Sequence, residues 1–155
     1  TVHISVEATT VGSGILLSQD VDIYEGETAA ETVVRMLQNN GYSVDYTGNY
    51  ETGFYLARIS SESNFVTGNI PEDLRTKLEE HGFEIYDFTP NSLGDYDFTK
   101  GSGWMYQVNG VYPNYGLSDY CFQNGDTLRL RFTLAYGADI GQDMTGGSDN
   151  WGYEW

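Results

Sequence analysis

The chain has 155 residues, which is enough for one domain with a sizeable core, and its 39% hydrophobic and 15% aromatic content excludes an intrinsically disordered acidic chain. Seven basic residues against 23 acidic ones give a formal net charge of −16, which repels nucleic acid and anionic membrane surfaces and leaves cations, cationic partners and neutral ligands. The single cysteine, Cys121, excludes an internal disulfide, and no apolar run approaches the length of a membrane span.

The first forty residues predict two strands followed by a helix. Apolar residues alternate at Val2, Ile4 and Val6, which is the period of a half-buried strand. The segment ILLSQDVDIYEG predicts a second strand with a bend at residues 18–19. Residues 28–41 then carry capping-box spacing, one apolar stripe and a terminal glycine, which together indicate a well-capped helix.

The middle of the chain predicts a pair of short strands and a second helix. The strand pair falls within residues 42–60. The segment PEDLRTKLEEHG starts with a proline and two acids that favour the positive end of a helix. Its apolar side has only Leu74 and Leu78, so we expect this helix to lie on the surface of an insertion that spans about 62–100.

Turn signals divide the C-terminal half. The sequence YDFT occurs at 86–89 and again at 96–99, and four residues are too few for a repeating module, so strand ends or turns are expected. A strand over 103–108 runs into Asn-Gly, the strongest signal for a tight hairpin. Residues 127–136 alternate like another strand, and the tail from about 137 to 155 has no period and is expected to be irregular. The order of elements predicts an α+β fold, with a sheet packed on one main helix.

The stretch 101–135 also carries a set of motifs that resembles the transcobalamin-like C-terminal domain family. That pattern is a Gly-Trp strand, an Asn-Gly hairpin, a Gly-x-x-Asp-Tyr segment, and Gly-Asp leading into a strand. The matching residues are Gly103, Trp104, Asn109, Gly110, Gly116, Asp119, Tyr120, Gly125 and Asp126. The resemblance covers most of the chain, except the segment around 62–100 and the tail after Gly147.

The resemblance implies a single β-grasp-like domain over 1–155, with a small mixed sheet curled around one helix. In the cobalamin carriers of this family the domain closes over the corrin, whose other side lies on a separate helical domain. A hairpin that corresponds roughly to residues 104–120 helps to contact the ligand. The present sequence includes no such helical partner, so it is expected to hold half of a corrin site. Most bacterial relatives are segments of secreted or wall-attached proteins whose ligands are unknown, so the fold carries over better than the ligand.

The aromatic residues around the Asn-Gly hairpin form the candidate ligand-binding site. Alternation places Trp104 and Tyr106 on one face of their strand, where they either fill the core or reach a ligand. We expect Trp104 to be mainly core, and Tyr112 and Tyr115 in the following loop to be partly exposed, as aromatic binding surfaces often are. The candidate ligand-binding residues are Trp104, Tyr106, Asn109, Tyr112, Asn114 and Tyr115.

Acidic clusters at 95–98 and 139–150 offer a candidate cation site. Calcium takes six to eight oxygen ligands, which Asp, Asn and loop carbonyls supply. Neither stretch matches an EF-hand, and the competing interpretation is that these acids are simply solvated. The candidate metal ligands are Asp139, Asp143 and Asp149.

Enzymatic function has little support, because His3 and His81 are the only histidines and no acid lies in a segment that the sequence marks as a cleft. We expect a non-enzymatic, monomeric binding module of a bacterial surface or secreted protein, with cobalamin or Ca²⁺ as candidate ligands. The composition and the start at Thr1 favour an extracellular location, with the signal peptide and any anchor removed. The alternative is a structural spacer or adhesin module with no small-molecule ligand, which a hairpin packed under the inserted helix would favour.

Overall fold

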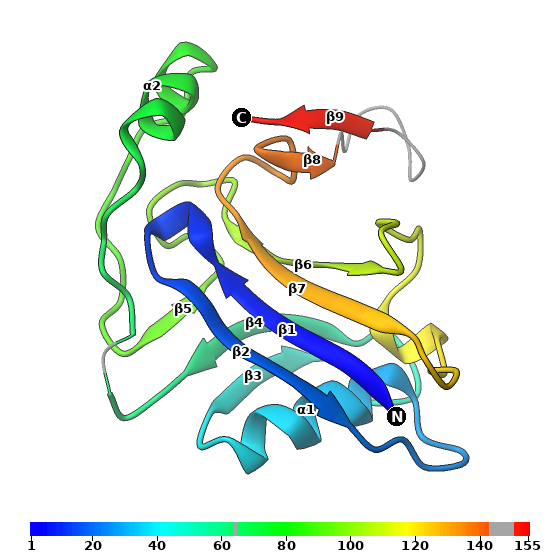
Figure 1. The fold of residues 1–155 in the computed structure, drawn as a ribbon. Coiled ribbons are helices and arrows are strands. Elements are labelled where there is room, and N and C mark those ends of the chain that lie inside the picture. The colour runs from blue at the N-terminus through cyan, green and yellow to red at the C-terminus, as the bar shows by residue number, and fades with distance from the viewer. Residues whose placement is uncertain (64, 143–150) are drawn as a thin grey trace.

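The computed structural model describes residues 1–63, 65–142 and 151–155. Within them the chain forms two α-helices, α1 (Ala29–Asn39) and α2 (Glu72–Glu80), and nine strands (Figure 1). The strands are β1 (Val2–Ala8), β2 (Gly14–Val21), β3 (Ser43–Thr47), β4 (Tyr55–Ser60), β5 (Ser92–Gly94), β6 (Gly103–Val108), β7 (Thr127–Thr133), β8 (Ile140–Gln142) and β9 (Trp151–Glu154). Neither helix is long and apolar enough to cross a bilayer.

The main sheet has the strand order β2-β1-β7-β6. Its two central strands are parallel, with Ile4 opposite Leu128, whereas β1 pairs with β2 and β6 pairs with β7 in antiparallel fashion. The side chains of Ile4 and Leu128 are fully buried, as the alternation in the sequence predicted. The expected α+β architecture, a mixed sheet packed on one main helix, is therefore confirmed.

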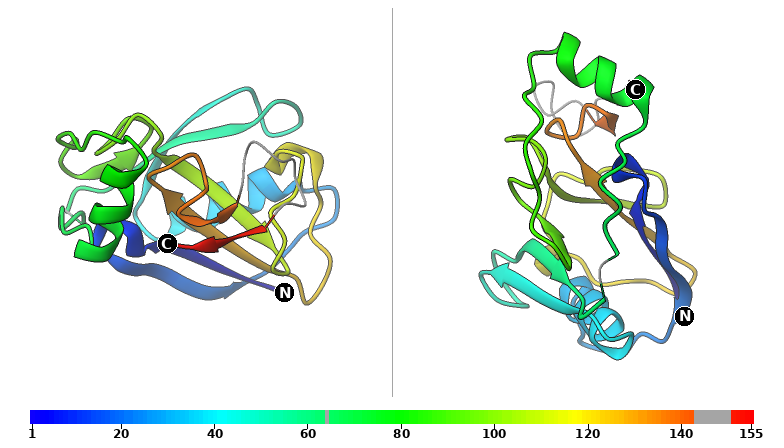
Figure 2. Two further views of the ribbon diagram at one scale, coloured as in Figure 1. Left: turned by 90° about the horizontal axis from the view of Figure 1, so that it is seen from above. Right: turned by 90° about the vertical axis from the view of Figure 1, so that its left-hand side faces the viewer.

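Helix α1 lies between the β1–β2 hairpin and strands β3 and β4 (Figure 2). The Thr28 hydroxyl caps it by accepting a hydrogen bond from the Glu31 N–H at 3.4 Å. At the other end Gly41 takes φ of 86°, and the Tyr42 N–H donates to the Leu37 carbonyl at 3.0 Å. These contacts satisfy helix-end groups that would otherwise lack partners, and they are the caps that the sequence predicted.

A second sheet, of order β3-β4-β5, contains the predicted strand pair and one strand that the sequence did not predict. Strand β5 comes from the segment expected to be an insertion, so part of that segment belongs to the sheet. Helix α2 precedes it and is present as predicted, with Leu74 and Leu78 as its buried side. Strand β2 is continuous over residues 18–19, so the predicted bend there is wrong. The irregularity in its pairing with β1 lies at residues 15–17, opposite the step from Val6 to Glu7.

The two YDFT segments meet each other. The Tyr86 N–H donates to the Phe98 carbonyl at 2.5 Å, and the rings of Phe88 and Phe98 stack with centroids 4.7 Å apart. The buried Asp97 carboxylate accepts hydrogen bonds from the Gly94 N–H at 2.9 Å and from Arg58 at 2.6 Å. Residues 96–99 belong to the turn that follows β5, and residues 86–89 form an irregular segment that lies against this turn. Asp97 is the buried partner of Arg58 in an ion pair within the turn.

The tail is not wholly irregular, which corrects the sequence-based expectation. Strands β8 and β9 pair antiparallel, with Ile140 opposite Glu154. They are three and four residues long, and Gly141 has φ of 89°. Strands this short leave no readable period in a sequence, and their pairing depends on the fold bringing them together.

Candidate functional site

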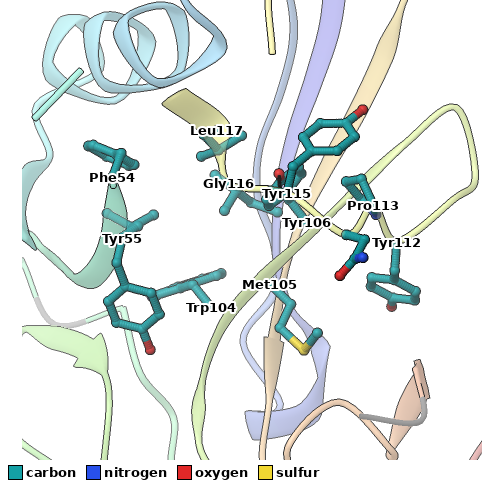
Figure 3. Close-up of a pocket in the computed structure, with 13 residues that line it drawn as sticks. Phe54, Tyr55, Trp104, Met105, Tyr106, Tyr112, Pro113, Tyr115, Gly116 and Leu117 are labelled. Atoms are coloured by element: carbon teal, nitrogen blue, oxygen red, sulfur yellow. Dashed lines mark hydrogen bonds between the residues drawn. The ribbon is translucent and has the colours of Figure 1, made fainter. Parts of the chain in front are cut away.

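An apolar cleft of about 470 Å³ lies between the start of β4, strand β6 and the loop that follows β6 (Figure 3). Its lining comes from three separated parts of the chain, residues 54–56, 104–106 and 112–117, together with Leu130 of β7. The lining residues are Phe54, Tyr55, Leu56, Trp104, Met105, Tyr106, Tyr112, Pro113, Asn114, Tyr115, Gly116, Leu117 and Leu130. None of these side chains carries a charge at neutral pH, and six of them are aromatic.

The Asn-Gly turn brings the loop back over β6. Asn109 and Gly110 have φ of 52° and 86°, and the Val108 N–H donates to the Val111 carbonyl at 2.8 Å, as in the predicted tight hairpin. Strand β6 is the outer strand of the main sheet. The cleft therefore runs along the edge of β6, where consecutive residues 104–106 all reach it.

Asn109 belongs to the frame of the turn and does not line the cleft. Its side-chain amide donates to the Asp126 carboxylate at 2.9 Å, and its oxygen accepts from the Thr127 N–H at 2.9 Å. These two hydrogen bonds tie the turn to the start of β7. Asn109 therefore stabilises the turn, whereas the other five candidate ligand-binding residues line the cleft.

Trp104 is mainly core, as predicted, and is 6% exposed. Its indole N–H donates to the Leu93 carbonyl at 2.9 Å, and its ring packs edge-on against Phe132 with centroids 5.2 Å apart. The same side chain forms part of the cleft wall. The core interpretation is therefore confirmed for Trp104, and contact with a ligand stays a prediction for the edge of the ring that borders the cleft.

Tyr106 and Tyr115 hold one side of the cleft. The Tyr106 hydroxyl donates to the Tyr115 carbonyl, which fixes the loop against the strand. Burial raises the pKa of Tyr106, and electrostatic interactions with the Tyr115 hydroxyl and with the Asp119 carboxylate raise it further. The Tyr115 side chain is 41% exposed, as expected, and its ring stacks on Tyr120 with centroids 5.7 Å apart.

Tyr112 is buried, so the prediction that it would be partly exposed is wrong. It is 2% exposed, and its hydroxyl donates to the Ile140 carbonyl at 2.6 Å and accepts from Arg131 at 3.3 Å. Strand β8 supplies that carbonyl from the tail. Because the tail was expected to be irregular, the sequence held no sign that a partner for this hydroxyl would come from it.

The wall from residues 54–56 was missed by sequence reasoning. The Tyr55 hydroxyl donates to the Asp95 carboxylate at 2.7 Å. Partial burial of the hydroxyl raises the pKa of Tyr55, and the hydrogen bond to Asp95 raises this pKa further. The Phe54 N–H donates to the Ser118 hydroxyl at 3.2 Å, and a Cβ on Gly116 would stand 3.3 Å from the Phe54 carbonyl. These contacts close one end of the cleft. The signal available was the aromatic pair after Gly53, but local periodicity cannot say which element it faces.

Of the three candidate calcium ligands, the structure describes Asp139. Asp139 is buried; its carboxylate accepts from the Thr133 hydroxyl and from the Leu134 N–H at 2.7 Å, and burial raises its pKa. It caps the end of β7 and does not face solvent. Asp143 and Asp149 lie outside the described residues. Among residues 1–63, 65–142 and 151–155, no group of three or more His, Cys, Asp or Glu side chains could hold a metal ion.

One histidine has the hydrogen-bond order of a catalytic triad. His3 lies 2.9 Å from Asp20 through Nδ1 and 2.9 Å from the Ser18 hydroxyl through Nε2. The side chains of His3 and Asp20 are 41% and 76% exposed. In a working triad the carboxylate is buried, and this is what holds the imidazole in one orientation and stabilises its charged form. The exposed group therefore gives little support to an enzymatic function.

Comparison with known proteins relates the C-terminal part of the domain to a described family. Residues 82–133 match the family described as "Domain of unknown function (DUF4430)". The match contains β5, β6, the hairpin and β7, and it begins inside the segment that we expected to be an insertion. It therefore includes the cleft residues from Trp104 to Leu130 but not the wall from 54–56. No curated protein matches the chain.

Proposed function

We propose that this chain is a non-enzymatic, extracellular ligand-binding module related to the transcobalamin-like C-terminal domains, with the aromatic cleft as its binding site. The observation that carries the proposal is the cleft itself. Its volume of about 470 Å³ lies within the roughly 300–1,000 Å³ of typical ligand sites. Its lining is apolar and aromatic, with a few polar tips, which is the usual composition of such sites.

The family relationship rests on the motif residues and on where they lie. The residues from Gly103 to Asp126 that carry the resemblance fall inside the matched segment 82–133. They form β6, its tight turn and the approach to β7, in the order that the resemblance requires. A mixed sheet with a parallel central pair and one main helix is compatible with a β-grasp-like domain.

The position of the hairpin favours binding over a spacer role. Helix α2 lies at the end of the molecule away from the loop after β6, in both the front and the top view (Figures 1 and 2). Helix α2 therefore does not lie over the cleft, and two of the lining residues, Asn114 and Tyr115, are exposed. A spacer has no need to keep an apolar cleft open to water, since exposed apolar patches invite association.

Cobalamin is the first ligand to test. A corrin is larger than the cleft, so residues such as Tyr115 and Met105 would hold one edge of the macrocycle against the apolar wall. The remaining face of the corrin would be left for a second domain or partner. We therefore expect weak binding by this chain alone, because half a site provides neither the full contact area nor the exclusion of water.

The test is calorimetric titration with cyanocobalamin, supported by NMR of the Trp104 indole N–H with small aromatic probes. Tyr115→Leu should weaken any cleft ligand by roughly fivefold or more, as loss of an interface aromatic commonly does. Tyr24→Leu is the matched control, because Tyr24 is an exposed tyrosine that does not line the cleft. If cobalamin and every aromatic probe leave the Trp104 signal unchanged, the spacer alternative replaces this proposal.

A further inference from the structure

The aromatic rings of the cleft stand on two sides of an open space. Phe54, Tyr55 and Trp104 lie on one side and Tyr106 and Tyr115 on the other, with Met105 between them (Figure 3). The face of an aromatic ring carries partial negative charge. A ligand placed between these side chains is therefore in an environment that attracts a cation without any formal charge in contact with it.

Four polar side chains of this lining are already hydrogen-bonded within the chain, whereas the Asn114 amide and the Tyr115 hydroxyl are the polar groups that a ligand can reach. The Trp104 indole donates to the Leu93 carbonyl at 2.9 Å, and the hydroxyls of Tyr55 and Tyr106 donate to Asp95 and to the Tyr115 carbonyl. The Tyr112 hydroxyl is likewise taken by Ile140. A sugar, whose many hydroxyls need donors and acceptors in return, would find few of them here. The exposed rings of Tyr55 and Tyr115, which are 45% and 41% exposed, are the main surface that the cleft presents to a ligand. Phe54 and Trp104 are each 6% exposed and add only a narrow apolar wall.

The charges around the cleft favour the same class of ligand. Asp95 accepts the Tyr55 hydroxyl at 2.7 Å, and the negative charge of Asp119 acts on the Tyr106 hydroxyl. Arg131 does not line the cleft but donates to the Tyr112 hydroxyl at 3.3 Å, and the Glu7 carboxylate lies 3.9 Å from the Arg131 guanidinium. The whole chain has a net charge of −16, so anions are repelled and cations are drawn toward it.

We propose that the cleft binds a small organic cation whose charge is spread over methyl groups, a quaternary ammonium group, held between the aromatic rings by cation–π attraction. This inference rests on the proposed function, since it names the ligand class for the same site. Such a group needs no hydrogen bond and fits an apolar, aromatic lining. Its charge agrees with the acidic field of the domain.

The experiment compares choline with 3,3-dimethyl-1-butanol, which has the same shape but a carbon in place of the charged nitrogen. Binding is followed by NMR of the Trp104 indole N–H and by calorimetry, in 0.15 M salt. Choline should bind roughly 5- to 30-fold more tightly than the neutral isostere. Tyr115→Phe should keep this preference because it keeps the ring, whereas Tyr115→Leu should reduce it.

Each outcome decides the inference separately from the proposed function. Equal binding of choline and its isostere would leave a ligand-binding cleft but overturn its preference for a cation. Choline binding that survives Tyr115→Leu and disappears in 0.5 M salt would be general attraction to an acidic protein, and would overturn the inference as well. If neither compound binds, the quaternary ammonium class is wrong, and the cobalamin and aromatic-probe titrations still test the cleft by themselves.

Discussion

Replacing Tyr112 with Phe removes one oxygen atom from the interior and keeps the ring. The lost hydroxyl donates to the Ile140 carbonyl at 2.6 Å and accepts from Arg131 at 3.3 Å. Both bonds are buried, so water cannot replace the missing partner. The variant therefore isolates the link between the loop after β6 and strand β8.

The expected loss is about 1–2 kcal/mol in the free energy of unfolding. A buried hydrogen bond contributes about 1 kcal/mol net, and leaving a buried partner unsatisfied costs about 1–3 kcal/mol. The Ile140 carbonyl keeps a second donor, Arg131 at 3.3 Å, so the lower part of that range applies. Tyr112→Ser also removes the ring and should cost on the order of 3–5 kcal/mol, like other deletions of a buried aromatic.

Urea denaturation followed by circular dichroism measures this difference. With a slope of about 2 kcal/mol per M, Tyr112→Phe should lower the midpoint by roughly 0.5–1 M. Tyr115→Phe is the matched control, because its side chain is 41% exposed and should shift the midpoint by less than about 0.2 M. If Tyr112→Phe unfolds at the wild-type midpoint, as the control should, the contact between Tyr112 and the tail does not exist in solution.

Trp104→Ala should cost on the order of 3–5 kcal/mol in chemical denaturation, since the ring is buried against Phe132; wild-type stability would show that it is not core. Val34→Asp should prevent folding, as seen by loss of the cooperative transition, because it buries an unpaired charge on α1. Burial alone would raise the pKa of Glu7, but hydrogen bonds from Arg129 and Ser5 and the charges of Arg129 and Arg131 outweigh it and lower the pKa below 4.5. Glu7 should thus stabilise the fold above pH 4.5 and lose this effect as the pH falls through its folded pKa, a dependence that Glu7→Gln should reduce in melting curves. Saturating calcium should raise the melting temperature if the tail acids bind it, and an unchanged melting temperature would mean that they are solvated or, like Asp139, internally bonded.

Local signals predicted those elements whose ends and faces are written in neighbouring residues. Helix α1 was predictable because Thr28 and Gly41 supply its caps, and the turn at Asn109 was predictable because two adjacent positions need positive φ. Strand β5 was not, because its three residues become a strand through pairing with β4. The same holds for β8.

The sequence predicted one wall of the cleft, formed by β6 and its loop, but not the opposite wall, which comes from another sheet. Alternation along β6 and the loop composition identified Trp104 and Tyr115, because both follow from the hairpin. The opposite wall at Tyr55 comes from another sheet, and sequence periodicity describes the faces of one strand without saying which strand will face it. Tyr112 failed in the same way, since its burial depends on a carbonyl that arrives from the end of the chain.

The parallel pairing of β1 with β7 also affects the order in which the domain can fold. Strand β1 lies between β2 and β7, and its register joins His3 to Thr127. Because the chain is synthesised from its N-terminus, the edge of β1 that pairs with β7 stays open until residue 133 has been synthesised. Contacts of this sequence separation slow folding, and open edges attract other chains. The main sheet can close only after most of the chain is available, so any shortened version that ends before β7 should aggregate.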